Sequence, residues 1–102
     1  MNTHYPLSGW ANKGGTATRA CSCQTWKQHW INFADQRWPA QCAVSACPNA
    51  PTLGAHVYHP DVSGEQIVPM CARCNMRTDK FSLKPGVCVV SANRSETCDA
   101  RS

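Results

Sequence analysis

Aromatic and polar positions follow a helical period in one stretch of the chain. Trp26, Trp30 and Phe33 recur at i, i+4 and i+7, the spacing that places side chains on one face of an α-helix. Pro39 cannot continue a helix, so the pattern predicts a helix over residues 24–35. We expect its aromatic face to pack against a small core, because aromatic side chains at helical spacing are usually buried. A platform on which bases stack is the alternative interpretation.

The second half of the chain carries short apolar runs separated by turn residues. Residues 53–59 place His56 and Tyr58 on one face and Val57 on the other, as in a short strand. A turn follows at 60–64, where Pro, Asp, Ser and Gly occur, and it predicts a β-hairpin. The remaining predicted elements are a strand over 66–70 as the second arm of this hairpin, a short helix over 72–80 and a final strand over 87–90.

Residues 1–20 differ in composition from the rest of the chain. They are rich in Gly, Thr, Ser and Asn and contain one tryptophan, Trp10. Such a composition offers little apolar surface to offset the entropy that is lost on ordering. We therefore predict a flexible N-terminal arm over 1–20 that is dispensable for folding, followed by a single zinc-binding domain over 21–102. A domain this short needs disulfides, metals or partners to be stable.

Eight cysteines in 102 residues make metal or disulfide bonds the first explanation for stability. No run of about 18 apolar residues is present, which argues against a transmembrane helix. Residues 1–20 have neither a basic start nor an apolar core, so a secretory signal is not expected. We therefore expect a cytoplasmic protein, and in a reducing compartment such cysteines bind metal more often than they pair. Export without a signal peptide is the alternative, and it would permit four disulfides.

The spacing of four cysteines predicts one zinc site. Cys42 and Cys47 form one pair, and Cys71 and Cys74 form the second. Tetrahedral zinc takes four such ligands, and each close pair delivers two of them from a tight turn. A zinc knuckle, a hairpin and a helix in this order make the treble-clef arrangement. We therefore predict a small α+β zinc-stabilised domain, a treble clef with an additional N-terminal helix and a C-terminal strand.

The other four cysteines leave two interpretations open. Cys21 and Cys23 precede the predicted aromatic helix, His29 lies within it, and Cys98 is close to the end of the sequence. These four residues form a candidate Cys3His site for a second zinc ion, with buried free thiols as the alternative. Cys88 lies in the last predicted strand, where a small buried residue is its expected role.

Two segments inside the zinc frame carry a family resemblance. Residues 54–57 read GAHV, and residues 66–75 read QIVPMCARCN. Over residues 42–81 the chain resembles the HNH endonucleases, whose treble-clef zinc core carries a ββα-metal nuclease site. The resemblance implies that His56 acts as general base on the attacking water, and that Asn75 helps to hold Mg²⁺ or another catalytic divalent ion.

Two positions depart from the HNH pattern. Ala55 stands where an acidic residue often precedes the base histidine, and Gln66 stands where an asparagine orients it. A catalytic ion would then have only His56 and Asn75 as candidate ligands, although hard divalent cations prefer carboxylate oxygens. The departures favour binding without cleavage. The alternative role for His56 is to brace the hairpin through hydrogen bonds, and we expect His59, near the turn, to be solvated.

Charge alone is a weak argument for a nucleic-acid partner. Ten Lys and Arg against six Asp and Glu give a formal net charge of +4. Four thiolates and one Zn²⁺ sum to −2, and a second site with three thiolates to −1, so the total falls to +2 or +1. Local clustering is more informative, because three cations recur at i, i+4 and i+7 on the predicted helix over 72–80, and a fourth extends the row. These residues are Arg73, Arg77 and Lys80, with Lys84 beyond them.

Three functions follow from these observations. The first is a zinc module that binds DNA or RNA without cleaving it, with the basic row against phosphates; a merely solvated helix face is the alternative interpretation of that row. The second is an HNH-type nuclease that uses His56, for which a secreted effector toxin is one natural setting. The third is an adaptor that contacts a protein partner through exposed tryptophans, with Trp10 and Trp38 as candidates. None of the three involves a membrane.

Overall fold

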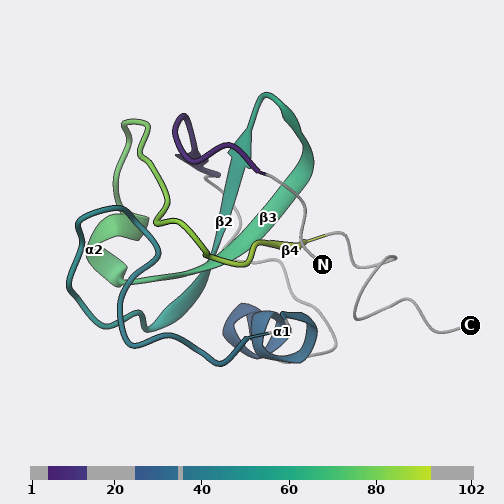
Figure 1. The fold of residues 1–102 in the computed structure, drawn as a ribbon, viewed down its shortest axis with the longest axis vertical. Coiled ribbons are helices and arrows are strands. Elements are labelled where there is room, and N and C mark those ends of the chain that lie inside the picture. The colour runs from purple at the N-terminus through teal and green to yellow at the C-terminus, as the bar shows by residue number, and fades with distance from the viewer. Residues whose placement is uncertain (1–4, 14–24, 35, 93–102) are drawn as a thin grey trace, which may run out of the picture.

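A computed structural model describes residues 5–13, 25–34 and 36–92 of the chain (Figure 1). The fold is a small α+β arrangement with one antiparallel sheet of four strands in the order β1-β2-β3-β4. No helix in the described part of the chain is long and apolar enough to cross a membrane. The elements are β1 (Ala11–Asn12), α1 (Trp26–Phe33), β2 (Leu53–His59), β3 (Val62–Met70), α2 (Ala72–Asn75) and β4 (Val90–Ser91).

The predicted hairpin is confirmed and is the longest part of the sheet. β2 and β3 pair with Ala55 opposite Val68 and His56 opposite Ile67. β3 begins at Val62, four residues earlier than the sequence predicts. The added residues include Gly64, whose backbone has a φ of 76°. A glycine can hold that conformation inside a strand, so β3 extends back to Val62, which pairs with His59 beyond an irregularity in the register.

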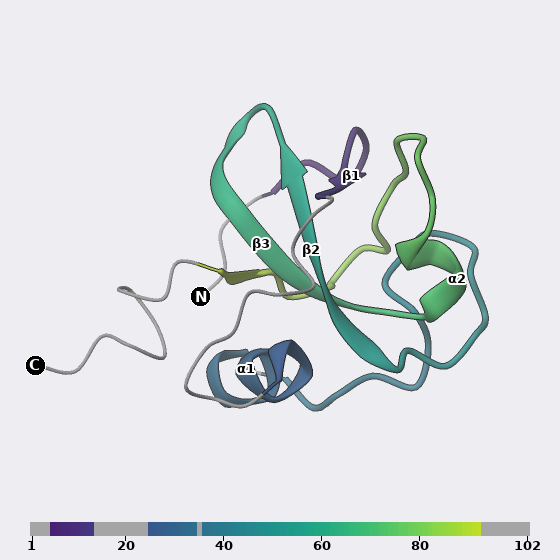
Figure 2. The same cartoon turned by 180° about the vertical axis from the view of Figure 1, so that it is seen from behind.

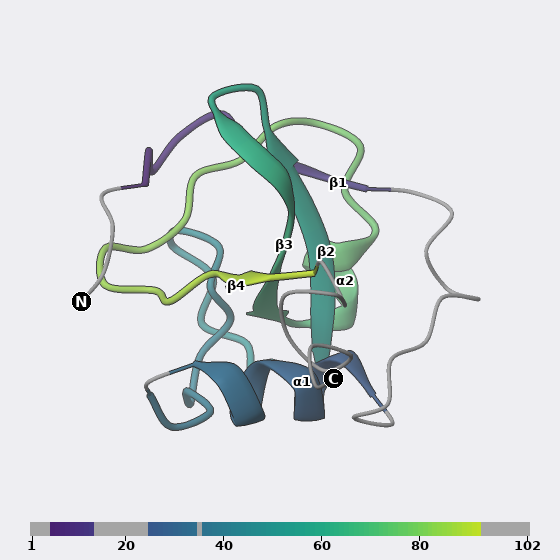
Figure 3. The ribbon, with the colours of Figure 1, turned by 90° about the vertical axis from the view of Figure 1, so that its right-hand side faces the viewer.

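The sheet separates two apolar clusters. Alternate side chains of a strand point to opposite faces, and Ala55 and Val57 belong to the larger cluster together with Cys71 and Cys74. On the other face, Ile67 packs with Trp30 and Val90. Figure 3 shows α1 lying across that side of the hairpin. The cysteines and α1 therefore occupy opposite faces of the sheet.

The predicted N-terminal helix is present over Trp26–Phe33. Thr25 caps it, since its hydroxyl accepts a hydrogen bond from the Gln28 N–H at 3.0 Å. Trp30 is buried as expected, but Phe33 is 45% exposed and so is not part of the packing face. Phe33 is the last helical residue, and the next backbone, at Ala34, is already extended. The helix is therefore too short to carry a three-residue aromatic face into the core.

The expectation that Trp10 belongs to a flexible arm is wrong. Its side chain is fully buried in the larger cluster, and its indole N–H donates to the Pro6 carbonyl at 2.8 Å. The Trp10 backbone exchanges two hydrogen bonds with Phe81, at 3.0 and 2.8 Å. β1 follows directly and pairs with the edge of β2 (Figure 2). One large buried indole offsets the polar composition around it. The predicted boundary at residue 20 lies outside the described residues.

The last predicted elements are shorter than expected. The final strand, predicted over 87–90, is observed as β4 (Val90–Ser91), which pairs with β3. Cys88 is half-buried against the α1 cluster, and its carbonyl accepts the Trp30 indole N–H at 2.9 Å. The predicted helix over 72–80 ends at Asn75 after one turn. The basic side chains expected on one helix face therefore do not share a helix.

Candidate metal centre

Four cysteines converge at one end of the hairpin. The sulfur atoms of Cys42, Cys47, Cys71 and Cys74 all lie within 4.8 Å of one another. The Cys47 sulfur is 3.8 Å from that of Cys71 and 3.6 Å from that of Cys74. These separations exceed the sulfur–sulfur bond length of about 2.0 Å in a disulfide. In the described part of the chain this is the one group of three or more His, Cys, Asp or Glu residues close enough to hold a metal ion.

The geometry fits a tetrahedral zinc ion. Zinc–sulfur bonds of about 2.3 Å place the corners of a tetrahedron about 3.8 Å apart. The observed separations of 3.6 and 3.8 Å are close to that edge length. Thiolate sulfur is also a ligand that zinc prefers, whereas magnesium and calcium require oxygen. The four cysteines are therefore suited to hold one zinc ion, and they would fill its coordination sphere.

The first pair of ligands is delivered by a tight loop. The Cys42 N–H donates to the Asn49 carbonyl at 2.8 Å, and the Cys47 N–H donates to the Val44 carbonyl at 3.1 Å. Ala46 has a φ of 66°, in the left-handed region that non-glycine residues rarely adopt. This conformation turns the chain sharply just before Cys47. The four residues between Cys42 and Cys47 thereby form a compact knuckle.

The second pair joins the end of β3 to α2. Cys71 caps this one-turn helix, because its sulfur accepts the Cys74 N–H at 3.5 Å. The Cys71 N–H in turn donates to the Cys42 sulfur at 3.4 Å, which links the two pairs. The Asn49 amide lies 3.8 Å from the Cys71 sulfur. Such donors stabilise negative charge on sulfur, and they orient the ligands around a metal.

The thiol pKa values differ within the cluster. Burial raises the pKa of Cys42 and Cys74, and close contact with other cysteines raises that of Cys74 further. Burial also acts against ionisation of Cys71, but the hydrogen bonds from Cys74, Asn49 and Cys47 outweigh it and lower its pKa to about 6. One ligand is therefore ready as a thiolate near neutral pH. Cys42 and Cys74 must release their protons when they bind a metal ion.

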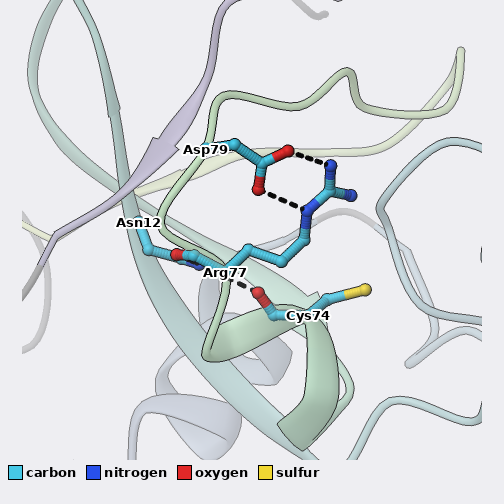
Figure 4. A network of polar contacts seen from close by, with 4 residues as sticks. All are labelled: Asn12, Cys74, Arg77 and Asp79. Atoms are coloured by element: carbon cyan, nitrogen blue, oxygen red, sulfur yellow. Dashed lines mark hydrogen bonds and ion pairs between the residues drawn. The ribbon is translucent and has the colours of Figure 1, made fainter.

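Asn12 connects the N-terminal segment to the metal centre (Figure 4). Its side-chain amide donates to the carbonyls of Cys74, at 2.9 Å, and Arg77, at 3.0 Å. These carbonyls lie at the end of α2 and just beyond it, and that of Cys74 also accepts the Arg77 N–H at 3.1 Å. The contact bridges 62 and 65 residues of sequence.

The four predicted basic residues have different surroundings. Arg77 makes two hydrogen bonds to the Asp79 carboxylate, at 3.0 and 2.7 Å (Figure 4). This ion pair raises the pKa of Arg77 and lowers that of Asp79. The Lys84 ammonium donates to the Cys47 carbonyl at 2.6 Å, and so braces the knuckle. Arg73 and Lys80 have exposed side chains.

The structure does not bring together the two residues that the HNH resemblance singles out. His56 is buried, and the ring of Trp26 from α1 lies 4.4 Å from its own. Its neighbours Ala55 and Val57 face the cysteines, so alternation directs His56 to the opposite side. Asn75 is exposed at the end of α2, on the cysteine side. No group of His, Asp, Glu and Cys in the described segments forms a second cation site with His56.

Two other predicted histidine roles can be compared with the structure. His59 is 8% exposed rather than solvated. Its Nδ1 accepts the Asp61 N–H at 2.9 Å, and its Nε2 lies 2.9 Å from the Ser8 carbonyl. His29 is fully buried, with Nε2 2.9 Å from the Ser91 carbonyl. The other members of the proposed second zinc site, Cys21, Cys23 and Cys98, lie outside the described residues.

The two tryptophans considered for a protein interface differ in exposure. Trp10 is fully buried. Trp38 is half-buried, and its indole N–H donates to the Pro51 carbonyl at 3.1 Å. Its ring packs edge-on against Trp30 and lies 4.9 Å from the Lys27 ammonium. Both indole N–H groups are hydrogen-bonded within the chain, and Trp38 keeps part of its surface exposed.

Sequence reasoning missed several residues that support the centre. Asn12, Asn49 and Lys84 hold the cysteine ligands or the carbonyls beside them. The sequence predicts phosphate binding for Lys84, but its contact with the Cys47 carbonyl disfavours that role. Asparagine at position 12 carries no local signal, because its partners are more than 60 residues away. Asn49 lies two residues after Cys47, so its closeness to the site could have been suspected from the sequence.

Comparison of the chain with protein-family models, with curated proteins and with solved structures found no match. Function is therefore inferred from the geometry of the chain itself. Within that geometry, the four-cysteine cluster is the feature with defined chemistry.

Proposed function

We propose that this chain is a structural zinc module of treble-clef type, which binds nucleic acid and does not cleave it. The observation that carries the proposal is the cluster of four sulfur atoms within 4.8 Å. The knuckle with Cys42 and Cys47, the β2–β3 hairpin and α2 with Cys74 follow one another in treble-clef order. Zinc in this site would cross-link two parts of the chain that meet in space.

A structural role is favoured over a catalytic one by the ligand set. Catalytic zinc keeps one coordination position open for water or substrate, whereas four protein thiolates leave none. Cys42, Cys71 and Cys74 are buried, and Cys47 is half-buried, so substrate has little access to the ion. A short domain with a limited core gains most from such a cross-link. Zinc would supply stability here, and the surface would supply function.

Nucleic acid is the partner that the exposed charges favour. Arg73 and Lys80 are exposed beside α2, while Arg77 is paired with Asp79 and Lys84 with the knuckle. About two phosphate contacts are therefore available, fewer than the four in the basic row of the sequence. The buried −2 charge of a zinc–thiolate centre also weakens the field around them. Binding should consequently be of short range and moderate strength.

Salt dependence of binding tests this proposal. With two phosphate contacts, the logarithm of affinity for a single strand should fall with the logarithm of salt concentration at a slope of about −1.4. Arg73→Gln should reduce the slope by about 0.7, whereas Arg37→Gln, an exposed arginine after α1, should leave it unchanged. Plasmid incubated with the zinc-loaded protein and Mg²⁺ should stay intact. Absence of zinc, cleavage of the plasmid, or a slope near zero would contradict the proposal.

A further inference from the structure

An exposed methionine follows α2 directly. Met76 is 79% exposed, the highest value among the exposed large hydrophobic side chains of the described residues. Its backbone is nevertheless fixed, because its N–H donates to the Arg73 carbonyl at 3.2 Å. The carbonyls on both sides, of Cys74 and Arg77, are held by the Asn12 amide. The fold thus presents an apolar side chain to solvent from a backbone that is anchored to the metal centre.

The residues that flank Met76 in the sequence are mainly cationic. Arg73 precedes it by three residues and Lys80 follows it by four, and both side chains are exposed. Arg77 is adjacent, and Asp79 is the one carboxylate in this stretch. The other described carboxylates, Asp61 and Glu65, belong to the far part of the β2–β3 hairpin. An apolar side chain among cations matches a polyanion that also exposes flat apolar groups.

We propose that the exposed side chains of Arg73, Met76 and Lys80 make up a surface that binds single-stranded nucleic acid. The inference rests on the proposed function and specifies the surface and the kind of strand. A base packs against the Met76 side chain, while neighbouring phosphates contact Arg73 and Lys80. A duplex would first have to unstack its bases to offer the same contact. Two phosphate contacts give little free energy to offset that cost, so an already unstacked strand is preferred.

The Arg77–Asp79 pair restrains this surface. The Asp79 carboxylate takes two of the five guanidinium N–H donors of Arg77, at 3.0 and 2.7 Å (Figure 4). The carboxylate also offsets the charge of Arg77, so a phosphate gains less from this residue than from an unpaired arginine. The side chain of Asp79 is 65% exposed, so a phosphate can displace it without unfolding. Asp79 therefore lowers affinity for the strand by competing with its phosphates.

Fluorescence anisotropy of zinc-loaded protein with a labelled oligonucleotide of about 12 nucleotides tests the inference. Met76→Ala should weaken binding about five-fold. The control Ile31→Ala removes a 38% exposed side chain from α1, on the other face of the sheet, and should leave affinity unchanged. Asp79→Asn should strengthen binding and steepen the salt slope by about 0.7, because it releases one further cation. A duplex of the same length should bind more weakly than the single strand.

The outcomes separate this inference from the proposed function. Binding by the wild type that Met76→Ala and Asp79→Asn leave unchanged would overturn the inference while the proposed function stands. Tighter binding to the duplex than to the single strand would do the same. No binding by a wild type that holds its zinc would overturn both the inference and the proposed nucleic-acid function. Zinc content measured for each variant ensures that a loss of affinity is not a loss of fold.

Discussion

The two faces of the β2–β3 hairpin are closed in different ways. On the α1 face, polar groups find partners within the protein: the Trp30 indole donates to the Cys88 carbonyl, and His29 lies against the Ser91 carbonyl. On the other face, four sulfur atoms gather among apolar side chains, and their nearest polar neighbours include one another. On the α1 face, the helix and the sheet pack directly against each other. The cysteine face instead has the composition of a metal site.

The difference shows where the stability of a short chain originates. The smaller cluster, around Trp30, Ile67 and Val90, is a conventional apolar contact between a helix and a sheet. The larger cluster contains Cys42, Cys71 and Cys74 among its buried members. Loss of metal would leave these thiols crowded and partly charged in an apolar setting. The comparison predicts that the cysteine face fails first when the metal or its ligands are removed.

Removal of a ligand should have the largest effect. Cys74→Ser should abolish tight zinc binding and unfold the domain, because structural zinc contributes about 10–16 kcal/mol of apparent binding free energy in small modules. Cys88→Ser is the matched control, since Cys88 lies outside the cluster on the α1 side. Far-ultraviolet circular dichroism with metal analysis measures both. Equal damage from the two variants would refute the assignment of ligands.

Acid should weaken zinc binding strongly. The pKa of Cys42 and Cys74 is raised, so at least two protons must leave when zinc binds near neutral pH. Affinity should then fall about a hundredfold for each pH unit of acidification. Below the Cys71 pKa of about 6 the fall should become steeper, because that sulfur also takes up a proton. Competition with a chelator at several pH values measures this, and a flat profile would contradict thiolate ligation.

Truncation of Trp10, the buried indole of the N-terminal segment, should have the next largest effect on stability. Trp10→Ala should lower the free energy of unfolding by about 3–5 kcal/mol, because a fully buried aromatic side chain leaves a cavity. Tyr5→Ala, in the same segment but 36% exposed, should cost much less. Urea denaturation of the zinc-saturated proteins gives both values. Similar small losses would mean that the segment is an arm, as its composition predicts.

Loss of the amide bridge should have the smallest effect. Asn12→Ala should destabilise the domain by about 1–3 kcal/mol, since the carbonyls of Cys74 and Arg77 lose a partly buried donor. The control Gln28→Ala removes an exposed hydrogen bond to Asn32 on α1 and should change stability by less than about 0.5 kcal/mol. The same urea experiment compares them. An Asn12 variant as stable as the control would contradict a stabilising role for the contact between β1 and the metal centre.

Local patterns predicted the local features of this fold. The spacing of Cys42, Cys47, Cys71 and Cys74 was sufficient to place them in one cluster, and alternation with turn residues identified the hairpin. Both signals lie within a few residues of sequence.

Features that depend on distant contacts were not predicted. The burial of Trp10 depends on pairing with Phe81, and the carbonyl of Cys74 in α2 accepts an amide from position 12. The prediction that Arg73, Arg77 and Lys80 share one helix face is wrong. Helical spacing places residues on one face only while the helix continues, and α2 ends at Asn75. Ala46 adopts a left-handed backbone conformation. The turn there was not predicted, because the position is not a glycine.

We expect the cysteine face to be built around zinc. A native mass spectrum of the purified chain, recorded before and after treatment with a chelator, tests this expectation. The mass should exceed that of the free chain by at least one zinc ion less the protons it displaces, and the charge distribution should become that of an unfolded chain once the metal is removed. A metal-free chain whose eight cysteines have lost hydrogens as four disulfides would contradict it.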